Sequence, residues 1–95
     1  MLIGSIRHKS LRRFAEDGVS RGLPSGSIDR LRRMLFYIDA IGTADELRVP
    51  PNFGAHQLTG GRKGLWSLTV TKNGRMVFRV TSDSVIEDMD LEDYH

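Results

Sequence analysis

The sequence predicts an α+β fold in the order βααβββ, with two N-terminal helices packed on one face of a mainly antiparallel sheet. Three observations lead to this prediction. The 95 residues provide for one hydrophobic core. An apolar stripe at helical spacing runs through residues 28–41, and two alternating runs flank Asn73-Gly74, a pattern typical of a hairpin. We therefore expect residues 1–95 to form a single domain whose second sheet face is partly open.

The N-terminal segment predicts a short strand followed by a helix. Residues 2–6 are apolar and contain no strong turn pattern, which indicates a strand buried on both faces. Leu11 and Phe14 recur at helical spacing within residues 8–17. Gly18 then supplies the left-handed conformation that ends many helices.

The second helix is the clearest element of the sequence. A connector rich in Gly, Pro and Ser spans residues 19–27, and the helix follows over residues 28–41, with Gly42 expected to end it. Its apolar stripe consists of Ile28, Leu31, Leu35 and Ile38. Its polar side carries Arg30, Arg32 and Arg33, for which a solvated face is the simplest interpretation.

The second half of the chain predicts a long loop and three strands. Residues 43–64 contain two prolines and four glycines, so we expect a loop interrupted by one short extended piece at most. The alternating runs 66–71 and 76–80 form the hairpin, and Asn73-Gly74 favours a type I′ turn because both residues tolerate positive φ. A less regular strand is expected over residues 84–91.

Cysteine is absent, and the charges are distributed unevenly. Without thiols, disulfide frameworks and thiolate metal sites are excluded. The formal net charge is +2, but residues 1–82 hold all fourteen Lys and Arg and only six acids, an excess of +8. This excess would attract a polyanion, unless the acidic end folds back and neutralises it. The N-terminal residues resemble neither a signal peptide nor a membrane span, so we expect a cytoplasmic protein without membrane contact.

Several phrases of the sequence occur together in one family. They are Leu-Thr-Gly-Gly-Arg-Lys-Gly-Leu-Trp-Ser-Leu-Thr-Val from Leu58, Asn-Gly-Arg-Met-Val-Phe from Asn73 and the closing Glu-Asp-Tyr-His at 92–95. With Arg-His-Lys at 7–9 and Asp-Arg-Leu-Arg-Arg at 29–33, they resemble the HigB-type toxins of the RelE/ParE toxin-antitoxin superfamily over nearly the whole chain. The resemblance implies a RelE/ParE-like, microbial RNase-like fold and a ribosome-dependent endoribonuclease, an mRNA interferase that inhibits translation.

The resemblance also implies partners and site residues. We expect a HigA-like helix-turn-helix antitoxin, with operator DNA bound only through that antitoxin, and neither a cofactor nor a metal ion. The catalytic candidates are His56, Arg75, Tyr94 and His95. The RNA-binding candidates are Thr59, Arg62 and Lys63 in the loop and Arg32 and Arg33 on the second helix. Arg62 and Lys63 would also hold the carboxylates of Glu92 and Asp93, which would bring the chain end to the site.

These residue types suit RNA cleavage. The reaction needs a base for the 2′-hydroxyl proton, positive charge near the pentacoordinate phosphate and an acid for the 5′-oxygen. Imidazole takes or releases a proton near neutral pH, so His56 and His95 would fill complementary roles. Arg75 would hold phosphate oxygens with its planar guanidinium, and Tyr94 would stack on or hydrogen-bond to a nucleotide. Trp66 is expected in the core rather than in the site.

Thr59 is the main departure from the family pattern, because active relatives often carry a lysine there. A threonine cannot offset phosphate charge, and the loss of such a contact in a transition state costs about 2.7–4 kcal/mol. Gly61 and Gly74 also replace the usual Asp and Trp. Two alternatives to cleavage follow. One is a slow or non-cleaving inhibitor that blocks the ribosome, and the other is a gyrase poison like the ParE branch.

Overall fold

The computed structural model describes residues 1–62 and 64–93. Its strands and helices are β1 (Leu2–Ile3), α1 (Lys9–Asp17), α2 (Ile28–Ala40), β2 (His56–Gln57), β3 (Leu65–Thr71), β4 (Gly74–Val80) and β5 (Val85–Asp93). Short 3-10 turns span Ser25–Ser27, Ala44–Arg48, Pro51–Phe53 and Gly60–Arg62. The α+β class and the predicted order of elements are confirmed, and β2 is the short extended piece within the long loop.

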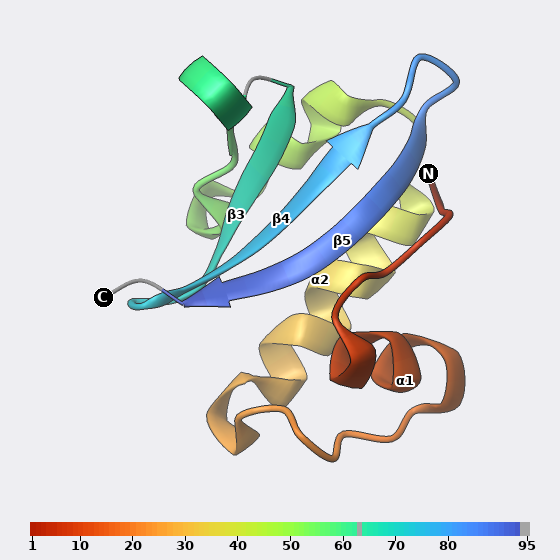
Figure 1. Cartoon of the computed structure of the whole chain (residues 1–95), viewed down its shortest axis with the longest axis vertical. Helices are drawn as coiled ribbons and strands as arrows, with labels where there is room; N and C mark the ends of the chain where they lie inside the picture. The colour runs from red at the N-terminus through yellow and green to blue at the C-terminus, as the bar shows by residue number, and fades with distance from the viewer. Residues whose placement is uncertain (63, 94–95) are drawn as a thin grey trace.

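The five strands form one sheet in the order β1-β5-β4-β3-β2. Only the outer pair of β1 and β5 is parallel, and the other neighbouring pairs are antiparallel. Figure 1 looks onto one face of this sheet, with α2 crossing behind the strands and α1 below β5 in this view. The expected arrangement, with helices on one face and the other face open, is confirmed. The last strand lies inside the sheet, between the first strand and the hairpin.

The core lies between α2 and the sheet. Leu31 and Ile38 of the predicted stripe and Met34 beside it are fully buried there, while Ile28 and Leu35 of the stripe are partly buried against the core. Trp66 is 3% exposed and belongs to this core, as the sequence predicts, with the guanidinium of Arg48 4.7 Å from the centroid of its indole ring. Trp66 is therefore a packing residue and presents no free face for stacking on a base.

The helix ends agree with the sequence in one case and differ in the other. His8 caps α1 by accepting a hydrogen bond from the backbone N–H of Leu11 at its Nδ1 atom (3.1 Å), and Gly18 ends the helix at φ 72°. The predicted end of α2 at Gly42 is displaced, because Ile41 is already extended. The N–H of Gly42 donates instead to the Glu46 carboxylate (2.9 Å), which belongs to the capping box of the next turn.

The first strand is shorter and less buried than predicted. Regular pairing is confined to Leu2–Ile3, and Ile6 adds an isolated bridge to Met89. Leu2 is 66% exposed, which contradicts a strand buried on both faces. The reason is position, because β1 forms the edge of the sheet and only one of its sides is paired.

The turn of the hairpin also differs from the prediction. Lys72 and Asn73 connect the closing pair Thr71 and Gly74, and neither Asn73 nor Gly74 has a positive φ. The predicted type I′ turn is therefore wrong, because that turn requires positive φ at both central residues. The register shift between Thr69 and Thr71 adapts the two strands to the different turn.

The orientation of α2 can be tested by matched substitutions on opposite sides of the helix. Ile38 is fully buried, so Ile38→Val should lower the free energy of unfolding by about 0.5–1.5 kcal/mol through the lost methyl group. Phe36 is 77% exposed, so Phe36→Ala should change it by less than about 0.5 kcal/mol. Urea unfolding of both variants measures the difference. A larger loss for Phe36→Ala would contradict this orientation.

Candidate functional site

The register of the strands gathers polar residues on the open face. One row across β2, β3, β4 and β5 consists of His56, Ser67, Val77 and Asp90. The adjacent row across β3, β4 and β5 consists of Thr69, Arg75 and Glu92. Because side chains in register on one face have Cβ atoms about 5 Å apart, these two rows form one continuous surface.

Ser67 lies at the centre of this surface. It is directly opposite His56 in the pairing of β2 with β3, and its Oγ atom accepts a hydrogen bond from Nη1 of Arg75 (3.2 Å). Ser67 is only 1% exposed although it faces away from the helices. Two of the predicted catalytic residues thus neighbour Ser67, Arg75 through its side chain and His56 through strand pairing.

Sequence reasoning did not identify Ser67. Its alternation with Trp66 and Leu68 correctly assigns it to the face opposite the core, and alternation alone implies a solvated residue there. The burial of Ser67 on that face depends on the tertiary fold, in which Arg75 donates a hydrogen bond to its Oγ atom. The available signal was the position of Ser67 within a family phrase.

His56 is exposed, and its ring is oriented by its own loop. Its Nδ1 atom lies 3.1 Å from the carbonyl oxygen of Gly54. A carbonyl oxygen only accepts hydrogen bonds, so the proton of a neutral ring is on Nδ1 in this contact. The Nε2 atom then carries the free lone pair, and this is the atom that can act as a base.

Arg62 and Glu92 form a bidentate ion pair. Nη1 donates to Oε1 (3.0 Å) and Nη2 to Oε2 (2.5 Å). The pair joins the Gly60–Arg62 turn, which precedes β3, to β5, which is two strands away from β3 in the sheet. Arg62 therefore holds the Glu92 carboxylate as the sequence predicts, and Lys63 lies outside the described residues.

The Arg62 guanidinium lowers the pKa of Glu92, chiefly through this hydrogen bond, and the charge of Arg75 lowers it further. In turn, Glu92 raises the pKa of Arg62. Because the carboxylate is stabilised in the folded state, its contribution to stability is complete above the pKa of an unfolded glutamate. It is lost as pH falls through the lowered pKa of the folded state.

Glu92→Gln tests this contribution. At about pH 7 the substitution should lower the free energy of unfolding by about 0.2–1 kcal/mol, the range for partly exposed ion pairs. Toward about pH 3 the difference from the unmodified chain should shrink, because Glu92 then loses its charge as well. Urea unfolding at several pH values gives the comparison. A difference that is constant with pH would count against the ion pair.

Other acids of β5 also fold back onto arginines. Arg79 contacts Glu87 (2.6 Å) and Asp88 (3.5 Å). Together with Arg62 and Glu92, these pairs neutralise part of the basic excess on the sheet. The acidic end of the chain therefore folds back and neutralises part of the basic excess, which is one of the two outcomes expected from the sequence.

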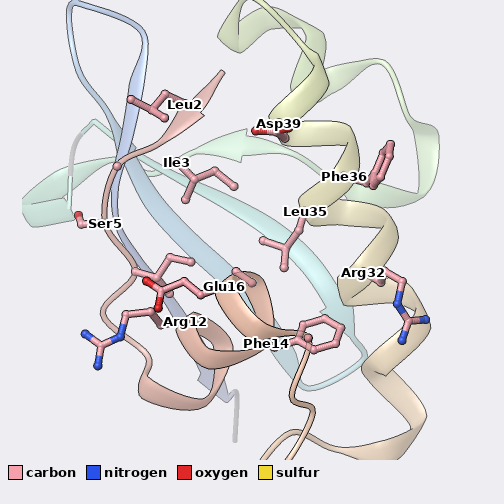
Figure 2. A pocket seen from close by; sticks show the side chains of 14 residues that line it. Leu2, Ile3, Ser5, Arg12, Phe14, Glu16, Arg32, Leu35, Phe36 and Asp39 are labelled. Carbon is pink, nitrogen blue, oxygen red and sulfur yellow. The ribbon is translucent and has the colours of Figure 1, made fainter.

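Arg32 and Arg33 do not join the open face. They lie on α2, on the other side of the sheet, where both donate to Asp29. Arg32 donates to the Asp29 carboxylate (2.7 Å), and Arg33 donates to the Asp29 backbone carbonyl (3.4 Å). Arg32 borders a hollow of about 760 Å³ between β1, α1 and α2, whose rim includes the exposed side chains of Leu2 and Phe36 (Figure 2). Any contact of this helix with RNA would thus use a second surface.

The remaining candidates lie in the loop and at the chain end. Thr59 is exposed and lies two residues after the end of β2. Tyr94 and His95 lie outside the described residues. Among residues 1–62 and 64–93, no group of three His, Cys, Asp or Glu side chains is placed to hold a metal ion, and no helix there is long and apolar enough to cross a membrane.

The sequence pattern of one family, described as a RelE-like toxin of type II toxin-antitoxin system HigB, matches residues 4–95. The chain belongs to this family of HigB-like toxins. A toxin of a type II system has an antitoxin partner.

Relatives and a solved structure add to this finding. The HigB-like toxin is 37% identical to "Endoribonuclease HigB" of Proteus vulgaris over 99% of its own length and all of that protein. It is 35% identical to "Toxin HigB-1" of Vibrio cholerae serotype O1 over 78% of its length and 79% of that protein. A solved YoeB/ParE toxin from Agrobacterium tumefaciens is 23% identical, covering 67% of this chain and 77% of that chain at a TM-score of 0.43, too remote to bear on the site.

Proposed function

We propose that this HigB-like toxin is an endoribonuclease that cuts messenger RNA on the ribosome and thereby stops translation. The observation that supports it is the convergence of His56 and Arg75 around Ser67, which offers a proton acceptor and a phosphate-binding fork on one face. The Proteus vulgaris relative named an endoribonuclease is similar over its full length.

In the proposed reaction, Nε2 of His56 takes the proton of a ribose 2′-hydroxyl, and the oxygen attacks the adjacent phosphorus. The bond from phosphorus to the 5′-oxygen breaks, which leaves a 2′,3′-cyclic phosphate on one fragment. The guanidinium of Arg75 binds the charged phosphate oxygens during this step. His95 supplies the proton to the departing 5′-oxygen, and Tyr94 stacks on a neighbouring base.

Purified ribosomes carrying a defined messenger RNA test the proposal. Primer extension should reveal new 5′ ends within the ribosome-bound message, and the same RNA without ribosomes should remain intact. Ribosomes that stall on an intact message would instead indicate the non-cleaving inhibitor. A DNA supercoiling assay with gyrase should show no effect, whereas inhibition would indicate the ParE-like poison.

We further propose that the partner is a HigA-like helix-turn-helix antitoxin in the cytoplasm, and that operator DNA is bound only through it. The +8 excess over residues 1–82 would otherwise give weak, salt-dependent binding to any DNA. Mobility shifts at about 150 mM salt should therefore show specific operator binding by the complex and none by the toxin alone. Specific binding by the toxin alone would contradict this role for the antitoxin.

Thr59→Lys tests whether a missing cation limits the reaction. Thr59 is exposed in the loop after β2, so a lysine there can extend into solvent or toward RNA without displacing the core. If the loop contacts the scissile phosphate, the substitution should raise the cleavage rate on ribosomes by about ten- to a hundredfold. Thr59→Gln, of similar length and uncharged, is the matched control and should give no such increase.

A further inference from the structure

Arg30 of α2 does not lie on a solvated helix face as the sequence suggests. Its Nη2 atom donates to two backbone carbonyls, those of Asn52 (2.6 Å) and Thr69 (2.7 Å). The guanidinium also lies 5.9 Å from the centroid of the Phe53 ring. A single side chain thus joins α2, the Pro51–Phe53 turn and β3.

The same turn leads directly to His56. Gly54 follows it at φ 55°, so close to β3 that a Cβ atom on it would come within 2.8 Å of Oγ1 of Thr69. The carbonyl oxygen of Gly54 is the contact of Nδ1 of His56. Arg30 therefore binds the loop just before Gly54, and it also binds β3, the strand against which Gly54 packs.

Arg30 makes these two contacts although another of its donors has no partner among the described residues. Its Nε atom is buried and makes no hydrogen bond to any described residue. A buried donor without a partner is unfavourable, so the packing is not arranged to satisfy this side chain fully. Both hydrogen bonds come from one nitrogen of a planar guanidinium, so the angle between them is fixed, whereas the donors of a lysine rotate freely.

We propose that Arg30 is a positioning residue for His56. Arg30 links the backbone at Asn52 to the backbone at Thr69. This link holds the Gly54 carbonyl where the carbonyl accepts the hydrogen bond from Nδ1–H of His56, and so keeps the basic Nε2 atom directed to the open face. The inference rests on the proposed function for its catalytic consequence, and on structure alone for its effect on the ring of His56.

Nitrogen NMR of the His56 ring tests the structural part. At a pH where the ring is neutral, the unmodified toxin should show the Nδ1–H form, and Arg30→Gln should show a mixture of both forms. Arg21→Gln is the matched control, since Arg21 is exposed in the connector between α1 and α2, and it should leave the ring unchanged. An Nε2–H form in the unmodified toxin, or an unchanged ring in Arg30→Gln, would overturn the proposal.

Kinetics on ribosomes test the catalytic part. Arg30→Gln should lower kcat by about ten- to a hundredfold at an unchanged KM, because misplacing a catalytic group affects the chemical step. In a His56→Ala background the same substitution should have no further effect, because the two residues act as one unit. An equal loss in that background, or a change confined to KM, would show a general structural or binding role and refute the proposal. Arg30→Lys should recover little of the rate.

The ring measurement and the kinetic measurement test different claims, so the result of one can contradict its claim while the other claim stands. If His56→Ala cleaves as well as the unmodified toxin while the ring form still responds to Arg30→Gln, the proposed function is wrong and the hold of Arg30 on His56 stands. If His56 is essential and its ring ignores Arg30, the proposed function stands and this inference is wrong. Melting temperatures of all variants confirm that each comparison is made on folded protein.

Discussion

Arg75→Ala should reduce cleavage of ribosome-bound messenger RNA by about a hundred- to a thousandfold, the cost of removing one charged donor from a transition state. Arg75 lies on β4 and its guanidinium donates to Ser67, the residue on β3 that is paired with His56 of β2. Its removal leaves the developing phosphate charge without this guanidinium. The rate of appearance of cut message in single-turnover reactions measures the effect.

Arg79→Ala is the matched control for this prediction. Arg79 lies on the same strand and the same face as Arg75, and its charge is engaged by Glu87 and Asp88. Its substitution should change the cleavage rate by less than about fivefold, because its charge is already paired with two carboxylates and it makes no described contact with Ser67. Equal losses in the two variants would mean that the whole basic face binds RNA and that Arg75 has no special part in the reaction.

Deletion of Tyr94 and His95 should abolish toxicity, with a loss of cleavage of about a hundred- to ten-thousandfold, the usual contribution of a general acid or base. The last described residues lie beside Arg75, because Glu92 is paired with Arg75 and bound by Arg62, and Asp93 is paired with Gly74, the first residue of β4. Growth of cells that express the truncated chain, and cleavage on purified ribosomes, measure the two effects.

The truncated chain should keep its melting temperature within a few degrees and still bind its antitoxin, because both deleted residues lie beyond the end of β5. His95→Gln alone should reproduce most of the loss in cleavage. Full toxicity of the truncated chain would remove the chain end from the mechanism and favour an inhibitor that blocks the ribosome without cutting.

Regular patterns predicted the parts of the fold that depend on one face of one element. The stripe on α2 and the two alternating runs of the hairpin each pack one face against the core, so their elements followed directly from the sequence. The limits of β1 and the conformation of the turn did not follow, because they depend on which strand forms the sheet edge and on the register of a bulge. These features are tertiary and leave no periodic signal.

The sequence also predicted some residues of the candidate site and missed others. His56 and Arg75 were identified by resemblance to a family, and the structure adds the common neighbour that joins them, Ser67. Arg30 was assigned to solvent, because a charge beside an apolar stripe usually is solvated. Its actual contacts lie 22 and 39 residues away along the chain, a distance at which local sequence carries no information.

The internal position of the last strand has a consequence for the timing of synthesis. β5 lies between β1 and β4, so the sheet cannot close until residues 85–93 have left the ribosomal exit tunnel. Pairing of the first strand with the last is a contact of long sequence separation, and such contacts form slowly compared with local ones. A growing chain therefore lacks the assembled face on which His56 and Arg75 meet. The candidate site is therefore assembled only after the segment 85–93 has been synthesised and has paired with its neighbours.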